Sequence, residues 1–407
     1  MAQWLKDCGV ESVVMQSTGV YWMAVYEVLQ SHGFQVNLVD ARGTKNLPGR
    51  KSDGQECQWL LRLHTSGLLR SCFLPPESIR RLRPAWRLRD RHVKEAGRCV
   101  QHMQRALTER NVQLHNTISD LGGVTGPAII RAILAGERDP VRLAALRDRR
   151  IPASPEELGH SLRGNWKEEA LFERQQAVEA YDFYGRQIAE CDRRLQPYLA
   201  ALPSRESVPQ APAAEGPTSR GPAGKPEVPR KVVKRKGNEP PFDIESQQRR
   251  ILGVDAPTIE GIDGMTVQTV RAEVGSDLSA WKTERHWSSW LNLAPKREVS
   301  GGRVIRHTRE HRTNRVGNAF RMAAQSLIPS PSYLGARFRY LRAKLGGVKA
   351  VKAMARVRAC LFYRLLTKGP TWVDRGTVEF ELRRQQREFA ALQRKARDFG
   401  MQLVPTA

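Results

Sequence analysis

A serine followed by two glycines opens a strongly basic stretch of this sequence, SGGRVIRHTREHRTNR at residues 300–315. Guanidinium groups bind phosphate oxygens through paired hydrogen bonds, and glycine lets a backbone amide approach a phosphate closely. The arginines would line up only in an extended or three-per-turn conformation, because residues three apart rotate around an α-helix. The stretch therefore predicts a basic wall that faces a polyanion. Its arginines stand at every third position: Arg303, Arg306, Arg309, Arg312 and Arg315.

Ser300 is the candidate nucleophile of this stretch, since a hydroxyl attacks phosphorus only with electrostatic help. Gly301 and Gly302 would bind nucleic acid through their backbone, together with the arginines. The alternative interpretation is a loop that only grips phosphate, with Ser300 as one more hydrogen-bond donor. His307 and His311 lie four residues apart, but no third ligand stands near them, which argues against zinc.

A second group of candidate residues is acidic. Asp53 and Glu56 in KSDGQECQWL are three residues apart, so on a helix their carboxylates share a face. Such a pair is suited to Mg²⁺, which prefers oxygen ligands. Equally, both residues suit the first turn of a helix, where acids are favoured without any metal. Gln16, at the end of a strand in VVMQSTGVYW, could add one carbonyl oxygen but no charge.

The composition indicates the class of partner. The 407 residues include 67 Lys and Arg against 42 Asp and Glu, which gives a net charge of +25 and a pI near 10.4. This balance favours nucleic acid. The six cysteines form no close pair, which argues against a zinc knuckle or a disulfide framework and fits a reducing cytoplasm. No apolar run approaches the ~18 residues of a membrane span, and the N-terminus does not resemble a signal peptide.

The sequence pattern predicts an α/β start followed by mostly helical regions. A strand in ESVVMQSTGVYW, a helix in YWMAVYEVLQSHG and a strand in FQVNLVD form a β–α–β rhythm, which implies parallel strands. Apolar stripes from Val93 to Leu114 and from Tyr181 to Leu202 suit either a coiled-coil hairpin or contact with a partner chain. The expected domains are an α/β fragment at 1–75, a helical coiled-coil region at 76–202, a disordered Pro-rich basic linker at 203–241, a mostly helical domain at 242–375 and a terminal helix at 376–407.

Five blocks of the sequence, in order and spacing, resemble the DEDD-type insertion-sequence transposases of bacteria, a family that includes the Piv DNA invertases. The resemblance implies a RuvC-like, ribonuclease-H-type metal domain at the N-terminus and an essential serine in the C-terminal domain, which matches Ser300. It also implies a partner RNA encoded by the element, which pairs with DNA, and assembly as a homo-oligomer. The blocks are ESVVMQSTGVYW, NLPGRKSDGQECQWLLRLHTSGLLRSCF, GIDGMTVQTVRAEVG, WSSWLNLAPKREVSGGRVIR and NRVGNAFRMAAQSL.

The sequence departs from this family at three of its four acids. The first aspartate has no counterpart, so we expect an N-terminally truncated chain or a misplaced start codon. Gln16 stands in place of the glutamate and Glu56 in place of the last aspartate, while Asp53 matches the third acid. Two-metal chemistry needs enough negative charge to hold two ions about 4 Å apart. We therefore predict weak Mg²⁺ binding at Asp53 and Glu56, and poor transposition.

The function that the resemblance implies is transposition or site-specific recombination of DNA. Ser300 would form a covalent link to DNA phosphorus with the help of metal held at the DEDD positions, here Asp53, Glu56 and Gln16. Two alternatives stay open. The chain could be a decayed transposase that only binds nucleic acid, or a junction resolvase that hydrolyses DNA with metal alone and does not need Ser300.

Overall fold

The computed structural model describes residues 1–41, 52–165, 168–205, 238–308, 314–370, 386, 389–390 and 392–401. The chain divides into two compact units, Met1–Pro75 and Pro76–Ala407. Most described residues are helical, as predicted for the C-terminal region, and the strands form two sheets of two strands each. Most of the predicted linker and much of the predicted terminal helix lie outside the described residues.

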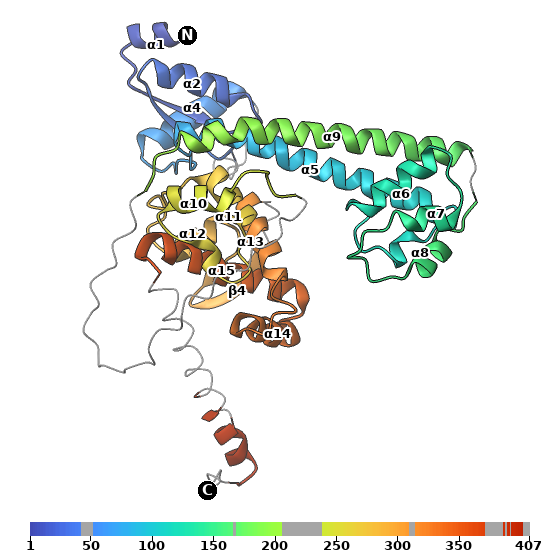
Figure 1. Ribbon diagram of the computed structural model, residues 1–407. Coiled ribbons are helices and arrows are strands. Elements are labelled where there is room, and N and C mark those ends of the chain that lie inside the picture. The colour runs from blue at the N-terminus through green and yellow to red at the C-terminus, as the bar shows by residue number, and fades with distance from the viewer. Residues whose placement is uncertain are drawn as a thin grey trace. The chain divides into compact units, whose positions relative to one another are not determined.

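The N-terminal unit is a small α/β unit (Figure 1). Strands β1 and β2 pair in parallel, with Ser12 opposite Gln35 and Gln16 opposite Val39, so the predicted β–α–β unit is confirmed. Its RuvC-like character stays an expectation. The elements of this unit are α1 (Ala2–Asp7), β1 (Ser12–Gln16), α2 (Trp22–Ser31), β2 (Gln35–Val39) and α4 (Asp53–Thr65).

Helix α2 ends where the sequence predicts. Gly33 adopts a φ of +85°, which glycine tolerates, and the next amide, of Phe34, donates back to the carbonyl of Leu29 at 3.1 Å. Leu29 and Phe34 are buried together with Ala2. This turn therefore sets the start of β2 and places both strand ends at one edge of the sheet.

Two long helices, α5 (Glu77–Thr108) and α9 (Glu168–Ala200), form a stalk in the second unit (Figure 1). Near one end of the stalk, Leu82 of α5 packs in one cluster with Leu195 of α9. Near the other end, Met103 packs in one cluster with Val178, so the helices run antiparallel. The apolar stripes thus meet within one chain, whereas true coiled-coil packing stays a prediction. Arg89 and Asp192 form a buried ion pair between the two helices.

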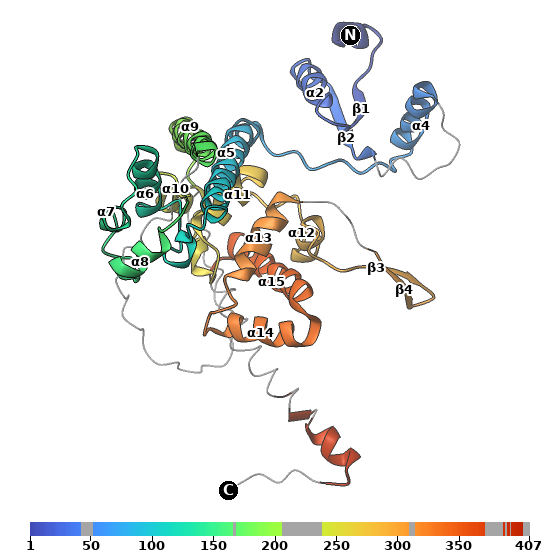
Figure 2. The same cartoon turned by 90° about the vertical axis from the view of Figure 1, so that its right-hand side faces the viewer.

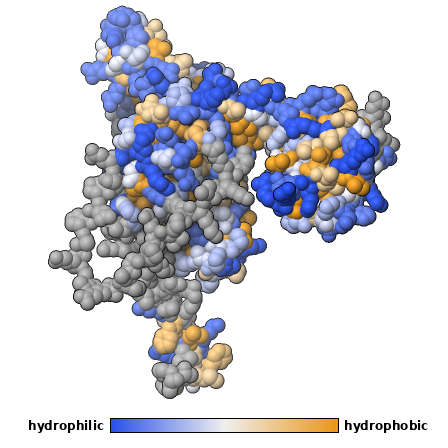
Figure 3. Space-filling model, viewed as in Figure 1, coloured by the Kyte–Doolittle hydropathy of each residue, from blue (hydrophilic) through white to orange (hydrophobic). Residues whose placement is uncertain are grey.

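A group of short helices covers the far end of the stalk. Their apolar residues, among them Ile129 and Leu143, share one buried core with the ends of α5 and α9. The visible surface of this end carries both hydrophilic and apolar residues (Figure 3), and Val141 and Phe172 are exposed there. The helices are η1 (Leu114–Asn116), α6 (Thr125–Leu134), α7 (Pro140–Ala145) and α8 (Pro155–Ser161).

The C-terminal part of the second unit is a helical bundle with one β-hairpin. Trp287 is fully buried, and its indole nitrogen donates to the carbonyl of Ala359 at 3.0 Å. Phe320 and Phe362 meet edge to face in the same interior. The elements are α10 (Ile244–Leu252), η2 (Ala256–Thr258), α11 (Gly264–Val274), α12 (Glu284–Trp290), β3 (Lys296–Ser300), β4 (Arg303–Thr308), α13 (Arg315–Gln325), α14 (Tyr333–Leu345) and α15 (Gly347–Lys368).

One predicted helix is shorter than the sequence pattern indicates. The pattern in LSAWKTERHWSSWLNLAP predicts a helix that stops at Pro295, whereas α12 covers only Glu284–Trp290. Thr283 is extended and its hydroxyl caps the helix by accepting from the amide of His286. Asn292, with a φ of +56°, closes the other end. Local capping therefore decided both ends of this helix.

Candidate functional site

Ser300 lies at the tip of a β-hairpin formed by residues 296–308, which we call the serine hairpin. Gly301 and Gly302 form its two-residue turn and have φ angles of +54° and +76°. Positive φ at both turn positions matches the twist of the flanking strands and strongly favours glycine. The turn places Ser300 directly opposite Arg303. Sequence reasoning expected a hinge and a basic wall here, but not a hairpin.

A β-bulge in the serine hairpin changes the face on which Arg306 lies. Residues three apart in a regular strand point to opposite faces, so the extended conformation alone does not align the arginines as predicted from the sequence. Here Val304 pairs with Val299 and Arg306 pairs with Glu298, which leaves Ile305 as the extra residue. Because paired residues share a face, Arg306 returns to the face of Ser300 and Arg303. The turn and the bulge together thus bring Arg303 and Arg306 to the side of the candidate nucleophile.

The tip of the serine hairpin is exposed to solvent. Ser300, Arg303 and Arg306 are all exposed, as are the two glycines of the turn. Figure 2 shows β3 and β4 extending away from the helices of the bundle. The side chain of Ile305 is 69% exposed as well. An extended molecule with a phosphate backbone can therefore reach Ser300 without any opening of the core.

The remaining predicted residues of the basic stretch differ in how they are placed. Arg309, His311 and Arg312 lie outside the described residues, and His307 lies in β4. Arg315 is the first residue of α13, and Asn314 caps that helix by accepting from the amide of Gly317 at 3.0 Å. The sequence predicts a helix cap at either Thr313 or Asn314, and the structure has it at Asn314.

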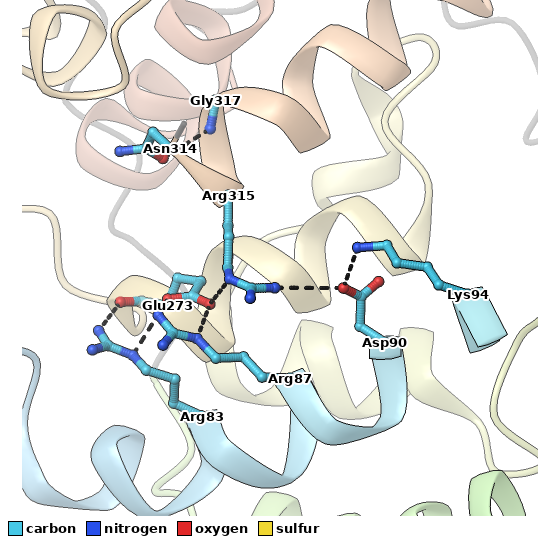
Figure 4. Close-up of polar contacts among 8 residues, drawn as sticks. All are labelled: Arg83, Arg87, Asp90, Lys94, Glu273, Asn314, Arg315 and Gly317. Atoms are coloured by element: carbon cyan, nitrogen blue, oxygen red, sulfur yellow. Dashed lines mark hydrogen bonds and ion pairs between the residues drawn. The ribbon is translucent and has the colours of Figure 1, made fainter. Parts of the chain in front are cut away.

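Arg315 takes part in an ion-pair network around Glu273, which we call the Glu273 node (Figure 4). Glu273, on α11, is 7% exposed and accepts two hydrogen bonds from Arg87 at 2.7 and 2.6 Å. Arg83 of the same stalk helix donates to its backbone carbonyl. Arg315 lies 3.9 Å from the Glu273 carboxylate and 3.5 Å from that of Asp90. The node therefore ties the stalk to the helix that follows the serine hairpin.

The two stalk arginines of the node differ in their electrostatics. The hydrogen bond to the Glu273 carboxylate raises the pKa of Arg87. Burial lowers the pKa of Arg83, which the attraction of Glu273 partly offsets. Both guanidiniums stay charged near neutral pH because arginine starts from a very high pKa. Arg315 thus sits in an environment rich in paired charge.

In the N-terminal unit, Gln16, Asp53 and Glu56 form what we call the carboxylate site. Helix α4 begins at Asp53, and the Ser52 hydroxyl caps it by accepting from the amide of Gln55. Asp53 and Glu56 both lie in its first turn. The amide of Gln16, at the end of β1, donates to Glu56 Oε1 at 2.9 Å. The structure therefore brings Gln16 and Glu56 into direct contact.

The carboxylate site does not fit a pair of metal ions in this arrangement. One oxygen of Glu56 accepts from an amide, and Asp53 is exposed in the first turn of the helix. Asp40, which sequence reasoning did not single out, directly follows β2 at the same sheet edge. Across the described residues, no group of three His, Cys, Asp or Glu side chains could hold a metal ion. In the sequence, the signal for Asp40 is its position at the end of a strand.

Comparison with known protein families shows which class of protein this chain resembles. A family model for DEDD-type transposases of the IS110 kind, described as a transposase, matches residues 1–111. This match covers the carboxylate site and part of α5. It supports a transposase or recombinase that acts on DNA, and it suggests dependence on a divalent metal.

A second family model, for the transposases of the IS116/IS110/IS902 family, matches residues 256–338. This match covers the serine hairpin and α13. Together the two matches support a transposase of an insertion sequence of the IS110/IS116 kind. No curated protein matches the chain. Among the helices of the described residues, none is long and apolar enough to cross a membrane.

Proposed function

We propose that this chain cuts and joins DNA through Ser300, as the transposase or recombinase of a bacterial insertion sequence. One observation carries the proposal: the Ser300 hydroxyl stands exposed on a glycine turn, with Arg303 opposite and Arg306 on the same face. A phosphodiester that lies against this face would meet a hydroxyl and two guanidiniums at once. Such preorganised positive charge stabilises the charge that develops on phosphate oxygens.

The proposed reaction exchanges one phosphodiester for another. Ser300 Oγ attacks phosphorus and passes its proton to water, and the new Oγ–P bond replaces the P–O bond to one sugar. The displaced sugar oxygen takes up a proton. Arg303 and Arg306 neutralise the non-bridging oxygens during this exchange. Because the phosphoserine link keeps the energy of the ester, a second sugar hydroxyl can reverse the step and join strands.

Mg²⁺ is the metal that we propose for the carboxylate site, with Asp53 and Glu56 as its ligands. A bound Mg²⁺ ion would act as a Lewis acid on phosphate oxygens. Glu56 can give both oxygens to an ion only after the hydrogen bond from Gln16 is broken, and Gln16 itself adds no charge. We therefore expect weak metal binding and slow turnover for this chain.

The proposal includes three finer features. A RuvC-like fold for the N-terminal unit is supported by the parallel strands and the position of α4 after them. A guide RNA encoded by the element is supported by the high positive charge and by the family resemblance, because base pairing would then read the sequence. A homo-oligomer is supported by the need to cut several DNA strands within one complex.

The test is to trap covalent protein–DNA adducts. Wild-type protein, Ser300→Ala and the control Ser289→Ala, an exposed serine on α12, are incubated with Mg²⁺ and the DNA that flanks the reading frame. We expect adducts that survive denaturation with wild type and the control, but none with Ser300→Ala, while all three bind DNA equally. Adducts of normal yield in Ser300→Ala would eliminate Ser300 as the nucleophile.

A second candidate function is that of a decayed transposase that only binds nucleic acid. The hydrogen bond from Gln16 to Glu56 favours this second function, because two groups expected to bind metal are hydrogen-bonded to each other instead. In that case wild-type protein binds DNA but forms no adduct at any Mg²⁺ concentration. Nicking without adducts would point to metal-dependent hydrolysis instead.

A further inference from the structure

A long part of the C-terminal sequence contains basic residues without a single acid. Between Glu310 and Asp374 there are thirteen Lys and Arg residues and no Asp or Glu. The described part of this stretch forms α13, α14 and α15, which pack on one another. Their positive charges must therefore find partners on other elements or outside the chain.

Several of these charges have partners within the molecule. Arg364 forms a hydrogen-bonded ion pair with Glu284. Arg358 is fully buried beside Gly261, and Arg321 donates to Asn318 at 2.7 Å. Arg315 belongs to the Glu273 node. These side chains have structural roles. The basic residues that are free to contact another molecule are therefore to be found among the remaining ones on the outer surface of the bundle.

Four exposed basic residues remain together where α14 ends and α15 begins. We call Arg339, Arg342, Lys344 and Lys349 the α14–α15 corner. Arg339 donates to the backbone carbonyl of Ser330 at 2.6 Å, and none of the four forms an ion pair with the described acids. From 339 to 349 every residue except Leu341 is exposed. Figure 1 shows α14 at the edge of the bundle, where a large partner could reach it.

We propose that the α14–α15 corner is a second DNA-contacting surface, which holds the phosphate backbone of the duplex on which the serine hairpin acts. Four like charges repel one another unless anions lie between them, and each phosphate contact releases bound counterions. The exposed Tyr340, at 58%, can pack its ring against the sugars. The family match ends at residue 338, so the corner lies just beyond the region that it covers.

DNA suits this surface better than an acidic protein would. Protein–protein interfaces are usually depleted in lysine relative to the rest of the surface, whereas the α14–α15 corner carries two lysines among its four charges. The proposal rests on the proposed function, because it takes DNA as the substrate. A surface that binds phosphates independently of sequence would hold the duplex while the serine hairpin engages one phosphodiester.

The test compares two triple variants of the full chain. The corner variant is Arg342→Gln with Lys344→Gln and Lys349→Gln. The control is Arg98→Gln with Arg193→Gln and Arg194→Gln, which removes three exposed stalk arginines that pair with Glu95 or Glu190. Binding to a fluorescent 30-base-pair duplex is measured from 50 to 300 mM KCl. The same measurements are made with an RNA duplex of equal sequence.

We expect the corner variant to bind DNA at least tenfold more weakly at 100 mM salt, and the slope of log affinity against log salt to fall by about 2 to 3. The control should change affinity by less than about twofold, because each of its arginines already pairs with Glu95 or Glu190. Equal losses in both variants, or no loss in the corner variant, would overturn the proposal. A loss confined to the RNA duplex would assign the surface to RNA and equally overturn it.

Two further measurements separate this inference from the proposed function. The thermal unfolding midpoint should not change in the corner variant, since its three residues are exposed. At saturating DNA its adduct yield should match that of wild type, because Ser300 is intact. If Ser300→Ala still forms adducts while the corner variant loses affinity for DNA, the assignment of Ser300 as the nucleophile is wrong. The proposal that the α14–α15 corner contacts DNA is then still supported.

Discussion

In the N-terminal unit the polar groups suited to a metal ion bind one another, whereas the groups suited to a phosphate at the serine hairpin face solvent. Gln16 donates to Glu56 at the carboxylate site. Ser300, Arg303 and Arg306 instead share one exposed face of a hairpin. Under the proposed function, the groups that would bind phosphate are therefore exposed in this chain, whereas one carboxylate that would bind metal already accepts a hydrogen bond from Gln16. The following experiments test this comparison and the helices that support the serine hairpin.

The largest expected effect is found by comparing a glycine of the serine hairpin with a glycine of the carboxylate site. Gly302→Val should lower adduct yield about 100-fold, because a β-branched residue is badly strained at a φ of +76° and the turn would displace Ser300. Gly54→Val, inside the first turn of α4, should leave the yield unchanged because that position has an ordinary helical backbone and open space around it. Denaturing gels quantify both. Equal yields would show that the turn does not position Ser300.

The second prediction restores charge at the carboxylate site. Gln16→Glu should tighten Mg²⁺ binding roughly tenfold, since one more unit charge near the ion is worth about 1–4 kcal/mol. Gln35→Glu, an exposed residue at the start of β2, adds the same charge elsewhere and should have little effect. Isothermal titration with Mg²⁺ measures both affinities. No gain in the Gln16 variant would mean that this strand end does not face the metal.

The third prediction probes the bulge at Ile305. Arg306→Gln should weaken DNA binding about fivefold and lower the salt slope by about 1, as expected for the loss of one phosphate contact. Arg285→Gln, an exposed residue of α12, should have a smaller effect. Fluorescence anisotropy at several salt concentrations provides the slopes. If Arg306 matters no more than Arg285, the face that the bulge creates does not bind DNA.

The smallest effect concerns the ion pair that joins α12, which precedes the serine hairpin, to α15. The hydrogen bond from Arg364 holds the pKa of Glu284 below its ordinary value. A lowered folded-state pKa stabilises the fold above the unfolded pKa, near 4.5, and this stability is lost as pH falls through the lowered value. Glu284→Gln should therefore cost about 0.5 kcal/mol at pH 7. The cost should shrink as the pH falls below about 4.5, which urea unfolding at pH 7 and at acidic pH would reveal.

Local signals in the sequence predicted much of the fold. The periodic apolar residues predicted α5 and α9, Gly33 marked the end of α2, and Asn314 marked the start of α13. Helix α12 was predicted too long because the cap at Thr283 and the positive φ of Asn292 override its apolar pattern. The short helices α6, α7 and α8 were not predicted, since their core depends on contacts with the ends of the stalk.

The sequence predicted the members of the candidate sites better than their arrangement. It singled out Ser300 with its glycines and arginines, and Gln16 with the two acids. It could not show that one extra residue, Ile305, turns Arg306 to the face of Ser300, because a bulge arises from strand pairing. Nor could it show the bond between Gln16 and Glu56, which lie 40 residues apart, or the pairing of Arg315 with Glu273.

The Glu273 node constrains the order in which substitutions can accumulate during evolution. Arg83, Arg87 and Arg315 all lie within ion-pair distance of the Glu273 carboxylate. If the acid is replaced first, three cations are left side by side, whereas replacing an arginine first leaves the acid with its other partners. Natural variants of this chain should therefore change an arginine of the trio before they change position 273.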